Sequence, residues 1–141
     1  MIDIAEVIRT YLLSKAAITA QVGTNVFGWQ VPPNFVASMP AKCICIKADG
    51  GPQIPLVPVL GWRVTFRCYG GEPGYLEAWE VARAIYDTLR RGGDEMVTVA
   101  DGDVYFYRSD CESPGFAIRE PQVDWPRVDI VFSMVFSEDA Y

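Results

Sequence analysis

The fold of this chain is decided by one stretch, GWRVTFRCYGGEPGYLEAWEVARAIYDTLRRGG, which occupies residues 61–93. Apolar and polar residues alternate over residues 62–69, which is the period of a strand with one buried face. Gly70 and Gly71 then end the strand, and Pro73 suits the first turn of a helix. The first half of the stretch therefore predicts a strand that leads through a tight turn into a helix.

The second half predicts an amphipathic helix over residues 75–89. Its apolar residues recur at helical spacing, and they are Leu76, Trp79, Ala82, Ile85, Tyr86 and Leu89. Arg90 and Arg91 put positive charge at the negative end of this helix, and Gly92 and Gly93 stop it.

The rest of the chain predicts an α+β domain. Asp3 suits the N-cap of a helix over Ile4–Leu13, and a short helix is expected over residues 16–21. Strands are expected over residues 42–48, 96–100, 104–108 and 127–137, with a short extended piece at residues 26–29. The prolines of residues 31–40 and 109–126 indicate loops, those of residues 53–59 a protruding arm or irregular edge, and residues 49–52 a turn. We expect a single domain over residues 1–141, with a mostly antiparallel sheet, an N-terminal helix and one long amphipathic helix packed on it.

Composition excludes several classes of function. The 141 residues carry a formal net charge of −6, and half of them are hydrophobic, so one well-packed core is expected. An acidic chain is poorly suited to grip nucleic-acid phosphates or an anionic membrane. No apolar run approaches the roughly 20 residues that span a bilayer, and the N-terminus lacks a basic signal-peptide region. We therefore expect a protein that is made in the cytoplasm.

The side chains that usually carry catalysis at neutral pH are missing or poorly placed. The chain contains no histidine, which excludes Ser-His-Asp and Cys-His mechanisms within it. The acidic pairs Asp94-Glu95, Asp101/Asp103 and Asp110/Glu112 fall at predicted turns, where acids commonly serve solvation and turn formation. We expect no enzymatic activity, no cofactor and no metal site.

The four cysteines are expected to be small buried side chains in a reducing compartment. Cys43 and Cys45 lie two apart in a predicted strand and so share a face. A disulfide between Cys45 and Cys68 stays open at this point, because the two predicted strands can be neighbours. A zinc site would need a C-x-x-C pair or histidines.

The order of elements resembles the tail terminator, or tail-completion, family of long-tailed bacteriophages, which are head–tail joining proteins. The resemblance is carried by the first helix, Ile4–Leu13, the small-residue region at residues 16–23 and the short apolar piece Asn25-Val26-Phe27. A Pro-led strand at residues 39–46, the strand at residues 62–69 and the helix at residues 75–89 complete it. This resemblance is a pattern of elements and covers the first two-thirds of the chain and its closing strand.

The resemblance implies a structural protein without catalytic residues. Such a protein forms a ring, usually a hexamer, between the capsid connector and the tail tube, ends tube growth and docks the head. DNA would pass through the lumen without specific binding. The alternatives are a head-completion (stopper) protein, another minor tail component, a small enzyme that uses carboxylates or a cysteine nucleophile, or an unrelated binding module.

Ring formation is heterologous, so one face of a copy must complement a different face of the next. Our candidates for subunit contacts are the arm and the charged side of the long helix: Ile54, Leu56, Val57, Val59, Leu60, Glu80, Arg83, Asp87 and Arg90. Contacts with a neighbouring ring are expected at Phe116, Ile118 and Trp125. The plainer alternatives are an arm folded over its own core and a solvated helix face, on which Asp87 pairs with Arg83 and Arg91 at i,i+4 spacing.

Overall fold

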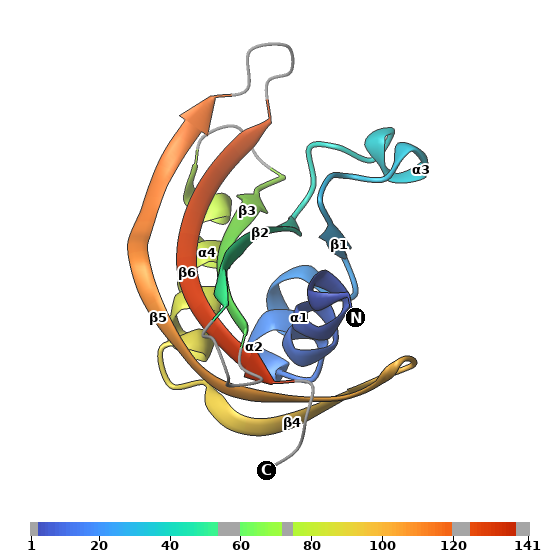
Figure 1. Ribbon diagram of the computed structural model, residues 1–141. Helices are drawn as coiled ribbons and strands as arrows, with labels where there is room; N and C mark the ends of the chain where they lie inside the picture. Colours follow the sequence, from blue (N-terminus) through green and yellow to red (C-terminus); the bar gives the residue numbers. More distant parts are fainter. Residues whose placement is uncertain (1–2, 54–59, 72–74, 120–124, 138–141) are drawn as a thin grey trace.

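The computed structural model describes residues 3–53, 60–71, 75–119 and 125–137. Four helices and six strands are formed by these residues (Figure 1). In chain order they are α1 (Ile4–Leu13), α2 (Ala16–Val22), β1 (Val26–Gly28), α3 (Pro33–Val36), β2 (Cys43–Gln53), β3 (Leu60–Tyr69), α4 (Leu76–Leu89), β4 (Gly93–Val99), β5 (Gly102–Arg119) and β6 (Pro126–Ser137).

All six strands form one sheet in the order β1-β2-β3-β6-β5-β4. Every pairing is antiparallel except the short parallel one between β1 and β2. The centre of the sheet is the long β3–β6 ladder, which runs from Leu60 opposite Phe136 to Tyr69 opposite Arg127. In Figure 1 the sheet curls around α1 and α2, and α4 lies behind β5 and β6. The predicted α+β class with a mostly antiparallel sheet is therefore confirmed.

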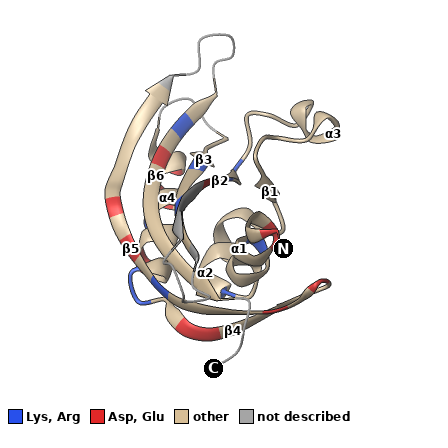
Figure 2. Cartoon of the chain, viewed as in Figure 1, with Lys and Arg blue, Asp and Glu red and all other residues tan. Residues whose placement is uncertain are grey.

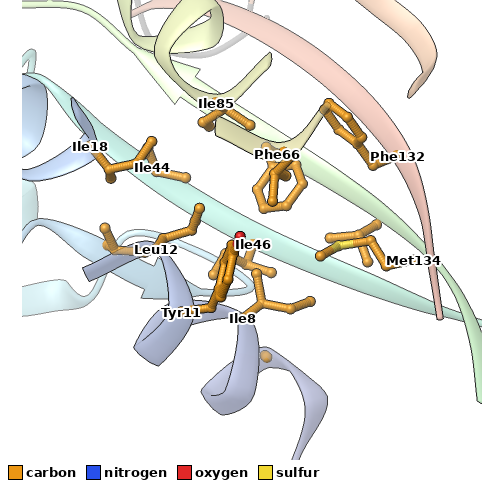
Figure 3. Packing of buried hydrophobic residues seen from close by; sticks show 14 of the residues in the cluster. Ile8, Tyr11, Leu12, Ile18, Ile44, Ile46, Phe66, Ile85, Phe132 and Met134 are labelled. Carbon is orange, nitrogen blue, oxygen red and sulfur yellow. The ribbon is translucent and has the colours of Figure 1, made fainter. Parts of the chain in front are cut away.

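One face of the sheet carries the main core. The alternation that the sequence shows in β3 and β6 holds, since Val64, Phe66 and Cys68 point to the same side as the alternate apolar residues of β6. Helices α1, α2 and α4 cover this face, and Figure 3 shows Ile8, Tyr11 and Leu12 of α1 close to β-sheet residues of the cluster. The Asp3 side chain accepts a hydrogen bond from the Ala5 N–H (3.0 Å) and so caps α1 as predicted.

A smaller cluster covers the other face at one end of the sheet. Its buried members are Val31, Cys43, Cys45 and Tyr69, with Phe27, Phe35, Met39 and Trp125 packed against them. Residues 31–40 were predicted to be a loop, but Pro33–Val36 form the short helix α3. Phe35 of α3 contacts Phe27 with their ring centroids 5.1 Å apart, which explains why this proline-rich segment is ordered against the sheet.

Two predicted loops are strand instead. Residues 109–119 continue β5, and their pairing with β6 extends to Arg119 opposite Pro126. The prediction was wrong because the register shifts on both sides of Ser113, so that Pro114 and Gly115 fit into bulges of the ladder. The turn predicted at residues 49–52 also lies within a strand, because β2 runs to Gln53 with a register shift after Gly50.

The predicted arm lies mostly outside the described residues. Ile54, Leu56, Val57 and Val59 fall in that part, and Leu60 begins β3. Gln53 and Leu60 pair directly across β2 and β3, so the arm is a connection between neighbouring antiparallel strands.

The four cysteines are free thiols, and the possible Cys45–Cys68 disulfide does not form. Opposite residues in a ladder share a face of the sheet. Cys45 lies opposite Arg67, whereas Cys68 lies opposite Ile44 in the main core. The two sulfurs therefore lie on opposite faces. Cys43, Cys45 and Cys68 are buried, and Cys111 is half-buried.

We expect thiol reagents to distinguish these cysteines in the folded protein. Burial raises the pKa of the Cys111 thiol, and it raises the pKa of Cys68 as well, so little reactive thiolate is present at pH 8. Maleimide should label Cys111 slowly and leave the three buried thiols unlabelled, and the rate should rise as the pH approaches the pKa of Cys111. Peptide mass spectrometry locates the label; rapid labelling of Cys68 without denaturant would contradict this packing.

Candidate protein interface

Helix α4 is held firmly against the sheet along one side. Its buried residues are Ala78, Val81, Ala82, Ile85 and Leu89. At its start, the Glu77 carboxylate accepts a hydrogen bond from the Gly71 N–H (3.1 Å). At its end, the Ser109 hydroxyl donates to the Leu89 carbonyl. The helix is therefore a rigid platform for the residues on its outer side.

The buried stripe of α4 agrees with the predicted apolar stripe at Ala82, Ile85 and Leu89 and differs from it at the start of the helix. Leu76 and Trp79 were expected in the core, but Leu76 is 75% exposed and Trp79 is 41% exposed. Ala78 and Val81 take the buried positions instead. Small side chains allow the helix to approach the sheet closely, which leaves the larger residues on its flank. Two large apolar side chains are thus open to a partner.

These exposed residues border a groove of about 460 Å³ between α4 and β5. The groove is lined by Leu76, Trp79, Glu80, Ala82, Arg83, Tyr86 and Pro114. Two of the predicted contact residues, Glu80 and Arg83, are therefore brought together at this groove. Leu76, Trp79 and Pro114 were missed as site residues; the signal that could have found them is a tryptophan next to alanines on a strongly patterned helix.

The groove is shaped by a glycine in β5. Gly115 has φ of +127°, and a Cβ atom there would lie 2.9 Å from the Trp79 ring. The tryptophan therefore packs directly on the strand backbone, in the bulged region that also presents Pro114.

We expect Gly115→Ala to destabilise the protein by about 1–3 kcal/mol, through backbone strain and the clash with Trp79. Urea unfolding followed by tryptophan fluorescence measures this effect. Gly28→Ala is the matched control, because a Cβ at Gly28 would meet only Ala5 at 3.8 Å and the backbone there is not left-handed. Equal losses in the two variants would contradict the role given to Gly115.

The charged residues of α4 pair differently from the expected i,i+4 pattern. Asp87 forms an ion pair with Arg90 at 3.7 Å, one turn away at i,i+3. Arg90 also lies 5.6 Å from the centroid of the Tyr86 ring. Glu80 is 3.4 Å from Lys42, which precedes β2. Glu80, Asp87 and Arg90 are well exposed, so the pairs add little stability and these charges stay available to a partner.

The other predicted contact residues lie elsewhere. Phe116 is 42% exposed and lies opposite Asp129, and Ile118 lies opposite Arg127, both on the face of the sheet away from α4. Trp125 is half-buried and packs edge-on against Tyr69, with ring centroids 6.0 Å apart. These three residues therefore lie at one end of the sheet face away from α4, which we call the outer face, and they are separate from the α4 groove.

The described residues contain neither a metal-binding cluster nor a membrane-spanning helix. Among them, no three His, Cys, Asp or Glu side chains gather closely enough to hold a metal ion. The helices in this part of the chain are all too short or too polar to span a membrane. In the view of Figure 2, Lys and Arg positions are interspersed with Asp and Glu positions along the chain.

The fold has a counterpart among solved structures. A chain from the virion of a native gene transfer agent particle matches with a TM-score of 0.61, over 92% of this chain and 91% of that chain. The two sequences are 21% identical, so the likeness shows a shared fold. No protein-family model and no curated protein matches this chain.

Proposed function

We propose that this chain is a structural protein of a virion. The observation that carries the proposal is the shared fold, which spans nearly the full length of both chains and whose counterpart comes from a virion particle. Because one fold can serve many functions, the surface matters as well. The exposed Leu76 and Trp79 on a rigid helix suit a protein that binds neighbours.

Within the virion, we propose a place in the neck as a tail terminator. This finer assignment draws on the resemblance of the helix and strand pattern to that family. Copies of the chain would form a ring, expected to be a hexamer, that ends the tail tube and receives the connector of the head. The net charge of −6 suits a ring whose lumen conducts DNA without binding it.

We propose two kinds of contact for this ring. Subunits would meet through the arm and the outer side of α4, with Ile54, Leu56, Val57, Val59, Leu60, Glu80, Arg83, Asp87 and Arg90 as contact residues. The end of the outer sheet face, with Phe116, Ile118 and Trp125, would meet the next ring. The α4 residues of the first surface and the residues Phe116 and Ile118 of the second lie on different faces of the sheet, which suits a subunit with both lateral and axial neighbours.

The role of this protein is expected to be non-enzymatic. The chain has no histidine, and the acidic pairs Asp101/Asp103 and Asp110/Glu112 are on exposed strand and turn positions. The charged residues that line the α4 groove, Glu80 and Arg83, are both exposed. They therefore do not form a water-excluded site for general acid–base catalysis.

Electron microscopy of particles made without this protein tests the assignment. A tail terminator predicts overlong tails that are detached from heads. Normal tails beside heads that have lost their DNA would indicate a head-completion protein instead. Light scattering on the purified protein, alone and with its tail-tube partner, tests ring formation, and particles of normal form and infectivity without the protein would overturn the proposal.

A further inference from the structure

The α4 groove has the chemistry of a site for an extended, proline-rich segment. Trp79, Tyr86 and Pro114 give it flat apolar walls. Among the lining residues, Trp79, Arg83 and Tyr86 carry hydrogen-bond donor groups, and Glu80 carries an acceptor carboxylate. Aromatic-lined grooves of this kind bind polyproline II segments, whose shape is already set and whose carbonyl groups are not paired internally.

One segment of the chain matches this groove. Residues 54–59 read Ile-Pro-Leu-Val-Pro-Val, without a charged or polar side chain. Pro55 and Pro58 are spaced as P-x-x-P, the pattern that such grooves read. Proline has no N–H, so this segment has more acceptors than donors, and three of the four polar side chains of the groove carry donors. The segment and the groove are therefore complementary in both apolar and polar character.

The segment of one copy is too far from the groove of the same copy. Gln53 pairs with Leu60, so the six residues between them reach at most about 12 Å beyond that pair. Leu60 lies opposite Phe136, whereas the residues on either side of Pro114 lie opposite Val131 and Asp129. Five to seven residues along β6 correspond to roughly 17–24 Å, and the groove is two strands farther across the sheet.

We propose that the α4 groove of one copy binds the Pro55–Pro58 segment of the next copy in a ring. This inference rests on the proposed function, since it assumes that copies assemble. The contact has two halves: the Pro55–Pro58 segment, which connects β2 and β3, and the groove on α4. Because the two halves are different surfaces, each copy gives one contact and receives one, as a closed ring demands.

Site-directed cross-linking tests this pairing in the full-length protein. One preparation carries Leu56→Cys and a second carries Leu76→Cys, both with Cys111→Ser so that the remaining native thiols are buried. The two are mixed, assembled and treated with a short bismaleimide. We expect a covalent dimer that joins the two variants, at least tenfold more abundant than in either preparation alone.

Met96→Cys is the matched control for the groove position. Met96 is an apolar β4 residue that is 42% exposed and lies opposite Tyr105, far along β5 from Pro114. It should give no dimer with Leu56→Cys. Rings that form in light scattering while Leu56→Cys links to Met96→Cys, or to neither position, would overturn this inference and leave the proposed function standing. A chain that stays monomeric with its virion partners present would overturn both.

Discussion

Phe106→Ala is expected to lower the free energy of unfolding by about 3–5 kcal/mol, the largest loss that we predict for a single apolar side chain. Phe106 is fully buried in β5. Its ring stacks on Phe136 with centroids 5.1 Å apart and meets the edge of Tyr11 at 4.9 Å. It thus joins helix α1 to the two longest strands, and its removal leaves a cavity between layers that cannot close easily.

Urea denaturation measures this loss, and Phe116→Ala is its matched control. Phe116 is on the same strand but is 42% exposed, so its truncation should change the free energy of unfolding by less than about 1 kcal/mol. If the two variants lost similar stability, the two phenylalanines would not differ in burial and the position of β5 over α1 would be wrong. Phe116→Ala should instead weaken assembly with a neighbouring ring, if that proposal is correct.

The parts of the fold that could be predicted are those with strict periodicity. In β6, Val128, Ile130 and Phe132 alternate with Asp129 and Val131, and the face that carries the main core follows from this period of two. The second half of β5 could not be predicted in the same way. Pro114 and Gly115 are loop signals taken alone, and only the ladder with β6 makes bulges of them. Long-range pairing thus decided against local preference.

The candidate site was only half visible in the sequence for a related reason. Glu80 and Arg83 can be placed on an outer helix face from spacing alone. The groove also needs Pro114, which comes from a strand that the sequence does not predict. The exposure of Trp79 depends on how closely α4 approaches the sheet, and Gly115 leaves room for the Trp79 ring there. Local sequence patterns do not carry this information, because it depends on contacts between residues that are distant in the sequence.

The second large effect is expected at the ion pair between Arg127 and Asp129 in β6. The Arg127 Nε lies 3.0 Å from Asp129 Oδ1, and the two side chains are only 14% and 7% exposed. The Arg127 Nη2 also donates a hydrogen bond to Asp129 Oδ2 at 3.4 Å. Removing one partner of so buried a pair leaves a charge without its counter-charge in a poorly solvated place, so we expect Asp129→Asn to cost about 3 kcal/mol.

The double variant Arg127→Leu with Asp129→Leu separates the pair from its parts. Buried ion pairs are costly to desolvate, and an apolar replacement of both partners is often tolerated. The double variant should therefore be more stable than Asp129→Asn alone. The single variants Arg127→Leu and Asp129→Leu should be strongly non-additive in a double-mutant cycle by urea denaturation. Additive losses would mean that the two charges act independently.

The same double variant also tests how this end of the outer face contributes to ring stacking. Ile118 and Phe116 lie opposite Arg127 and Asp129, so the contact can depend on the charges or on the apolar residues. Retained assembly in the double variant would assign the contact to the apolar residues.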